Sequence, residues 1–148
     1  FGTHKNGSIW CIFEKQSNSS LFEYCKDRGG LNVDQTAKAL YEICKALEPI
    51  HKANQIHGNL RPSQIFLGPN NSIQALKVGG YGGLNLYGVH KIDRKRMTFG
   101  DPSFFTYEQA ASKTTSLQTD LAALGLLGYF LITNRFPFEG TSTGDVGE

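Results

Sequence analysis

The sequence predicts an α+β fold that is mainly helical. In residues 34–52, apolar side chains recur at the three- and four-residue spacing that forms one face of a helix. A second apolar run, in residues 119–133, is typical of a fully buried helix. The strand-like segments are few and short, and they do not alternate regularly with helices. This order favours an α+β arrangement over a parallel α/β sheet.

Composition excludes several classes of protein. A chain of 148 residues fits one domain, and 39% hydrophobic with 19% charged residues is typical of a globular chain. A net charge of +2 is too small to predict nucleic-acid binding, and the basic run at residues 90–96 is expected to be a solvated loop. The three cysteines have no metal-site spacing, so we expect no metal and reduced thiols in an intracellular, cytoplasmic protein. No signal peptide or membrane-spanning run is apparent, so no membrane contact is expected.

The first half of the chain contains a strand and two helices. Residues 8–14 are β-branched and aromatic, which predicts a buried strand. A short helix is expected at residues 21–28, ended by the glycine pair that follows it. The long helix follows, with Asn32 or Asp34 as its cap and Pro49 expected to end or kink it. Its predicted buried stripe is Ala37, Leu40, Ile43, Cys44, Leu47 and Ile50.

The second half is predicted to contain a hairpin, a loop and the central helix. The runs at 65–67 and 75–78 flank a Gly-Pro-Asn-Asn turn, which indicates a small hairpin. A long surface loop is expected from residue 79 to residue 100, and a disordered tail from 139 to 148. Gly125 and Gly128 in the central helix are expected to let other backbone approach closely.

Four segments, in order, resemble the C-terminal lobe of a eukaryotic protein kinase, beginning at the hinge. "HGNLRPSQIFL" (57–67) is similar to the catalytic loop H-R-D-L-K-P-x-N, and "LKVGGYGGL" (76–84) to the segment that contains D-F-G. "TFGDPSFFTYEQA" (98–110) is similar to the end of the activation segment, and "TDLAALGLLGYFLITNRFPF" (119–138) to the central helix and its turn. The resemblance implies a partial kinase-like domain over residues 1–148, without most of the N-terminal lobe.

The resemblance divides this domain into functional segments. It implies a hinge strand and hinge at 8–16, a degenerate catalytic loop and D-F-G-like hairpin at 57–83, and an activation-segment-like loop at 84–110. The helices at 21–28, 34–52 and 119–133 would be the short, long and central helices of the lobe.

The resemblance also implies that the phosphoryl-transfer chemistry has changed. Asn59 stands where the family places the aspartate that accepts the substrate proton, and an amide cannot accept that proton. Gln64 replaces a magnesium-binding asparagine, and Gly80 replaces the magnesium-binding aspartate of D-F-G. No catalytic set is therefore intact, magnesium and ATP are not expected to bind, and the chain is interpreted as a pseudokinase rather than an enzyme.

Other positions match the family in type. His57 and Tyr81 correspond to the histidine and the phenylalanine that stack in active kinases, and Arg61 keeps the charge of the catalytic-loop lysine. Asp120 matches the central-helix aspartate that binds the backbone near the histidine, and Glu108 matches the glutamate of A-P-E. The resemblance therefore implies retained packing around altered chemistry.

Two sites are weaker. The resemblance implies a remnant of an adenine site, with Phe13 as gatekeeper, Glu14 and Gln16 in the hinge and Phe66 as floor. Simple core packing of the two phenylalanines is the favoured interpretation. Thr98 falls at the activating phosphosite, but Gly58 replaces the arginine that would bind its phosphate, so an ordinary loop threonine is favoured.

Three functions remain open. The leading hypothesis is an inactive protein-binding scaffold within a larger protein or assembly. Its partners would be other chains or other domains, because a lobe lacking its flanks exposes apolar surface on the central helix. The second is an atypical residual serine/threonine kinase whose N-lobe is supplied elsewhere, with Glu108 or Asp93 as conceivable substitute carboxylates. The third is a pseudokinase that binds nucleotide without magnesium.

Overall fold

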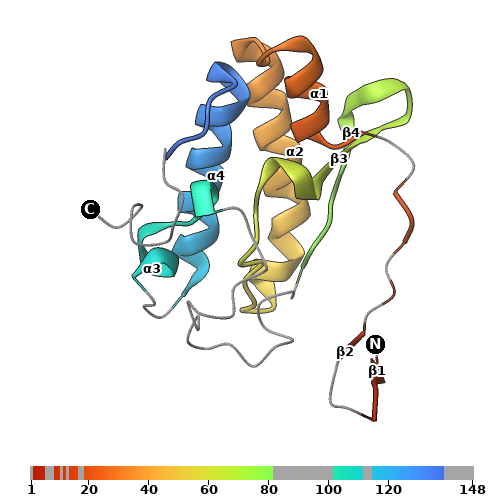
Figure 1. Ribbon diagram of the computed structural model, residues 1–148, viewed down its shortest axis with the longest axis vertical. Coiled ribbons are helices and arrows are strands. Elements are labelled where there is room, and N and C mark those ends of the chain that lie inside the picture. Colours follow the sequence, from red (N-terminus) through yellow and green to blue (C-terminus); the bar gives the residue numbers. More distant parts are fainter. Residues whose placement is uncertain are drawn as a thin grey trace.

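Three helices and a β-hairpin build the body of the molecule. In the computed structural model, the described residues are 2–5, 9–10, 12, 14–16, 19–81, 102–111 and 115–138. Helices α1 (Leu21–Arg28), α2 (Val33–Lys52) and α4 (Leu117–Thr133) lie beside one another (Figure 1). The hairpin of β3 (Ile65–Gly68) and β4 (Ser72–Val78) packs against α2. The predicted α+β, mainly helical fold is confirmed.

Helix α1 begins and ends at the predicted residues. Its N-cap is Ser20, whose hydroxyl accepts from the Glu23 N–H at 3.2 Å, while the Glu23 carboxylate accepts from the Ser20 N–H at 2.9 Å. This capping box satisfies backbone donors that the helix itself cannot pair. The same hydrogen bonds lower the pKa of Glu23. Gly29, at φ 85°, ends the helix in a conformation that glycine adopts most easily.

Helix α2 begins with Asn32 as its N-cap, with Gln35 completing the capping box. Pro49 does not end it, because the helix continues to Lys52. The predicted stripe is partly wrong: Ala37 and Cys44 are exposed. The buried face is rotated to the positions Thr36, Ala39, Ile43 and Leu47. A helix face is set by what packs on it, here β4 and α4, and not by the apolar residues alone.

The hairpin is confirmed, although β4 begins earlier than predicted. Ile65 pairs with Val78 and Phe66 with Lys77, and the register shifts before the Gly68–Ser72 pair. The turn is a short 3₁₀ segment, η2 (Pro69–Asn71), in which Asn70 has φ 56°. Asparagine tolerates this left-handed region better than most side chains, which explains the turn.

Helix α4 begins two residues earlier than predicted, after its N-cap Ser116. The prediction that it is fully buried is wrong, because Leu121, Tyr129 and Ile132 are 57%, 47% and 51% exposed. One face packs on α2 and the other has no cover within the described residues, so an all-round apolar sequence need not mean all-round burial. The expected close approach of other backbone is not seen: a β-carbon at Gly128 would lie 3.3 Å from the Leu40 side chain, and Gly125 faces open space.

The N-terminal strand is much shorter than predicted. Strands β1 (Gly2–Thr3) and β2 (Ile9–Trp10) form a two-residue antiparallel ribbon, with Gly2 opposite Trp10. Ile12, expected to be buried in residues 8–14, is 82% exposed. A lone two-stranded ribbon has no third strand on which to bury side chains. Neither strand pairs with another strand within the described residues.

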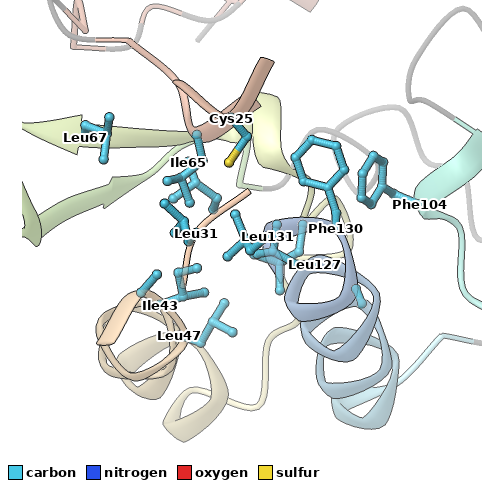
Figure 2. Close-up of a cluster of buried hydrophobic side chains, with 14 residues drawn as sticks. Cys25, Leu31, Ile43, Leu47, Ile65, Leu67, Phe104, Leu127, Phe130 and Leu131 are labelled. Atoms are coloured by element: carbon cyan, nitrogen blue, oxygen red, sulfur yellow. The ribbon is translucent and has the colours of Figure 1, made fainter. Parts of the chain in front are cut away.

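One apolar core joins α1, α2, β3 and α4 (Figure 2). Ile43 and Leu47 from α2 meet Leu127 and Leu131 from α4, and all four are nearly inaccessible to solvent. The phenylalanine rings of the short segment η3 (Pro102–Phe104) and of α4 meet edge to face, with Phe104 and Phe130 centroids 5.5 Å apart. Burying each such side chain contributes roughly 1.5–3 kcal/mol. None of the helices in the described part of the chain combines the length and hydropathy needed to cross a bilayer.

Candidate active site

The loop of residues 57–61 is fixed to α4 by a single carboxylate. Asp120, 1% exposed, accepts hydrogen bonds from the backbone N–H groups of His57 at 2.7 Å and Gly58 at 2.8 Å. Its Oδ2 also lies 2.8 Å from the Nε2 of His51 at the end of α2. We call Asp120 with these two N–H groups the Asp120 anchor. Its bonds to the loop backbone are those that the resemblance implied for Asp120, and the contact with His51 on α2 was not expected.

The His57 ring holds the loop to the end of β4. Its Nδ1 accepts from the Asn59 N–H at 3.2 Å, so its Nε2 must carry the proton, and Nε2 lies 3.0 Å from the Gly79 carbonyl oxygen. Burial lowers the pKa of His57, and nearby His51 lowers it further, while Asp120 and the Gly79 carbonyl oppose that shift. The neutral ring is therefore the form that fits both hydrogen bonds.

Tyr81 contacts this loop, and Arg61 is its last residue. The Tyr81 ring is tilted 54° to His57 with centroids 6.2 Å apart, a loose contact that leaves Tyr81 40% exposed. Arg61 is half-buried and precedes the 3₁₀ segment η1 (Pro62–Gln64), which leads into β3.

The three residues that replace the expected chemical groups lie together. A β-carbon built on Gly80 would be 2.5 Å from the Gln64 Oε1 and 3.2 Å from the Asn59 Nδ2. We call these residues the amide corner. The Gln64 side chain therefore occupies the space in which an aspartate at position 80 would begin. Gly80 also has φ 76°, which disfavours any other residue.

The amide corner offers different chemistry from carboxylates. Magnesium prefers anionic and carbonyl oxygens in an octahedral set, and the side chains of the amide corner offer it amide oxygens, from Gln64 and Asn59, and no carboxylate. Neither amide can accept the proton of an attacking hydroxyl. Among the described residues, no group of three or more histidine, cysteine, aspartate or glutamate side chains is arranged to hold a metal.

A cleft opens beside the loop, against η3 and α3 (Tyr107–Ala110). We call it the loop cleft; its cavity volume is about 10 Å³, room for about one water molecule. Its lining consists of Gly58, Asn59, Leu60, Arg61, Phe104, Phe105 and Gln109. Two of the residues that line it, Asn59 and Arg61, were expected to be functional.

Gln109 is a site residue that the sequence reading missed. Its Nε2 donates to the Gly58 carbonyl at 2.8 Å, and its Oε1 accepts from the Thr106 N–H at 3.1 Å. The buried amide thus ties the two walls of the loop cleft together. The spacing of Thr106 and Gln109 is that of a capping box, so the bond between these two residues could have been predicted from the sequence. The bond from Gln109 to Gly58 could not.

The remaining predicted residues do not form a site in the described structure. Glu14 is exposed and ion-paired with Lys77, Gln16 donates to the Glu14 carbonyl, and Phe66 packs over Gly79. Within the described residues Glu108 has no ion-pair partner, and it lies on α3 beside Gln109. Three named positions, Phe13, Asp93 and Thr98, lie outside the described residues, as do most of the 84–110 loop and the 139–148 tail.

Comparison with known proteins defines the class. The chain matches the protein kinase domain model over residues 2–147, and it belongs to this family. The Aurora kinase of Encephalitozoon cuniculi is 28% identical over 138 residues, which cover 92% of this chain and 48% of that protein. A probable serine/threonine-protein kinase PknB of Lactococcus lactis is 23% identical over 133 residues, 90% of this chain and 21% of that protein.

A solved structure shows the same fold. The crystal structure of Rad53 in complex with AMP-PNP superposes with a TM-score of 0.69 at 21% identity, covering 90% of this chain and 32% of that chain. The protein-kinase fold predicted from the four motifs is confirmed. The chain spans about half or less of the length of the relatives quoted.

One prediction is corrected by these comparisons. The chain was expected not to be an enzyme, because Asn59, Gln64 and Gly80 replace the catalytic groups. Its relatives are named as protein kinases, including serine/threonine kinases, so the comparisons point to an enzyme family. The three substitutions change the site, but by themselves they do not exclude the chain from the protein kinases.

Proposed function

We propose that this chain is the large-lobe part of a serine/threonine protein kinase domain whose loop cleft binds a segment of a partner protein. Phosphoryl transfer would require an N-terminal lobe supplied by another part of the protein or another chain, and it would be slow. The observation that carries the proposal is the contrast within 57–81: the loop is held by the buried Asp120 anchor, while the amide corner carries no carboxylate.

Binding is supported by the construction of the loop cleft. A pocket wall tied by Gln109 to the Gly58 carbonyl is preorganised, and preorganisation lowers the entropic cost of binding. The lining includes the buried rings of Phe104 and Phe105 and a half-buried cation, Arg61. Such a mixture of apolar and polar groups suits contact with the surface of an extended polypeptide.

Slow transfer follows from the residue types. A positioned general base contributes roughly 10²–10⁴-fold to rate, and Asn59 cannot supply it. The same substitutions weaken magnesium binding, so we propose that magnesium and ATP bind poorly. The partner is proposed to be another protein chain or domain.

A paired experiment tests the proposal. Binding of this chain to a degenerate peptide array is expected to fall when Gln109 is changed to Ala, and to be unaffected by Lys38→Gln on the exposed side of α2. Equal binding by wild type and Gln109→Ala would contradict a role for the loop cleft.

The rate is tested in a polypeptide that includes an N-terminal lobe. Wild type should phosphorylate peptides at least about 10²-fold more slowly than the triple variant Asn59→Asp, Gln64→Asn, Gly80→Asp. Equal rates would show that the amide corner does not limit transfer.

A further inference from the structure

We propose that Gln109 is a positioning residue for the loop of residues 57–61: its side-chain amide holds the Gly58 carbonyl and thereby fixes the place of Asn59 beside Gly80. This inference rests on the proposed function, because it names the residue that sets the geometry of the same site. Gln109 lies on α3, outside the loop and outside the amide corner, and it acts on the amide corner through the backbone of Gly58.

Gly58 is the residue of the loop whose backbone can rotate most freely. It is buried and has φ 71°, in the left-handed region that glycine adopts readily. Glycine also has the widest choice of other backbone conformations, and it has no side chain with which to favour this one. Contacts from outside the loop must therefore select the conformation of Gly58.

Two side chains from different helices make these contacts, one on each side of Gly58. On the amide side, Asp120 of α4 accepts from the Gly58 N–H through Oδ1 at 2.8 Å. On the carbonyl side, Gln109 of α3 donates from Nε2 to the Gly58 oxygen at 2.8 Å. These two backbone groups belong to different peptide units, so Asp120 orients the unit before Gly58 and Gln109 orients the unit after it.

The peptide unit after Gly58 leads directly into Asn59. Because that unit is planar, fixing its carbonyl also fixes its N–H, which donates to the His57 Nδ1 at 3.2 Å. The Asn59 Nδ2 in turn lies 3.2 Å from the place that a β-carbon on Gly80 would take. Rotating this peptide unit would break the bond to His57 and move Asn59 away from Gly80. Gln109 thus controls the position of the amide corner.

The Gln109 amide is well suited to this role because it is buried and used at both ends. Gln109 is 5% exposed, and its Oε1 accepts from the Thr106 N–H at 3.1 Å. The Thr106 N–H can only donate and the Gly58 carbonyl can only accept, so the amide has one orientation that satisfies both. Leaving a buried carbonyl unpaired disfavours a conformation by roughly tenfold or more.

Amide hydrogen exchange of this chain, followed by NMR, tests the proposal. Gln109→Glu keeps an oxygen for the Thr106 N–H, but at about pH 7.5 its carboxylate cannot donate to the Gly58 carbonyl. Exchange of the Gly58 and Asn59 amides, relative to wild type, is expected to rise about tenfold, while the Leu47 amide in the core does not change. At about pH 5 the ratio should fall back towards one, because burial beside a carbonyl favours the protonated carboxyl, which can donate.

Other ionisable groups near the cross-link are common to the variant and to wild type. They are Asp120, His57, His51, Arg61 and Glu108. Comparing the two proteins at the same pH therefore isolates the effect of residue 109. An acid-reversible change is the result that a positioning hydrogen bond predicts and that a simple loss of packing does not.

Two further variants make the outcome decisive. Gln109→Met has a similar length without polar atoms, so it should raise exchange at Gly58 and Asn59 equally at both pH values. Gln118→Glu makes the same charge change at an exposed position of α4 and should leave the loop as in wild type. Thermal melting shows whether each variant is folded, and the Met variant carries the test if the Glu variant is not.

The results distinguish this inference from the proposed function. Unchanged loop exchange in Gln109→Met, or an effect of Gln109→Glu that persists in acid, would overturn the positioning role. Peptide binding by wild type would in that case leave the proposed function standing. The expected exchange pattern in a chain that binds no peptide would overturn the proposed function alone.

Discussion

The Asp120 anchor and the amide corner both involve the loop of residues 57–61, yet they are built differently. At the anchor, a buried carboxylate is matched by two backbone donors and the His51 ring. At the amide corner, neutral side chains pack against a glycine. The anchor is demanded by folding, since unpaired backbone N–H groups are costly inside a protein, whereas the corner holds two amides and a glycine where the family resemblance implied other residues. Residues with a packing role and residues with altered chemistry therefore lie within a few positions of each other.

The largest loss of stability is expected when the Asp120 carboxylate is removed. Asp120→Ala leaves the N–H groups of His57 and Gly58 buried without an acceptor, which should lower the free energy of unfolding by about 3–5 kcal/mol. Urea unfolding measures this. Asp27→Ala, at an exposed position of α1, is the control and should change stability by less than about 0.5 kcal/mol. A small loss at Asp120 would show that the loop does not depend on the anchor.

The next largest effect is a difference in stability between substitutions on the buried and the exposed face of α4, the helix that contains Asp120. Leu127→Ala removes a fully buried side chain and should cost about 2–4 kcal/mol. Leu121→Ala, on the exposed face of the same helix, should cost less than about 1 kcal/mol, since little is buried there. Equal losses in urea unfolding would mean that the exposed face is covered in solution.

Substitutions in the amide corner should change stability less, and the effects of changing Gly80 and Gln64 should depend on each other. Gly80→Asp should destabilise by about 1–3 kcal/mol, because φ is positive and the new β-carbon meets Gln64. Shortening the neighbour with Gln64→Asn should recover part of that loss, so the double variant should be more stable than the additive sum. Strict additivity in thermal unfolding would show that the two positions do not share this space.

The smallest expected effect is on the pH dependence of stability, and it comes from the buried His57 ring in the loop shared by the anchor and the amide corner. The folded pKa of His57 lies below its unfolded value of about 6.5, so the unfolded chain binds more protons in acid. Its contribution to stability is therefore complete above about pH 6.5 and is lost as pH falls toward the lowered folded pKa. Comparing His57→Gln with wild type between pH 7.5 and 5 should show a smaller acid loss in the variant. An unchanged slope would contradict a neutral buried ring.

Local sequence signals predicted most of the fold. The glycine pair that follows residue 28 was expected to end α1, Asn32 was one of the two caps expected for α2, and the Gly-Pro-Asn-Asn turn predicted the hairpin. Tertiary contacts decided the remainder. The buried face of α2 is set by the packing of β4 and α4 against it. Leu121 is exposed because no described element packs on its side of α4. The spacing of apolar residues in the sequence predicts neither feature.

The site could be predicted only through family positions. Those positions identified the residues of the anchor and of the amide corner, but not that Gln64 occupies the space beside Gly80, which depends on a backbone angle. The cross-link from Gln109 to the Gly58 carbonyl joins residues 51 positions apart and has no local signal. The enzyme class was predicted wrongly because three substitutions were given more weight than the family resemblance itself.

The most direct test of the altered corner is Mn²⁺-induced line broadening in the NMR spectrum of this chain. Manganese takes magnesium's ligands and broadens nearby amide signals. The account predicts no selective broadening at residues 59, 64 and 80 in wild type, and broadening there once all three are changed to Asp, Asn and Asp. Selective broadening at these residues in wild type would show that the amides hold a metal after all.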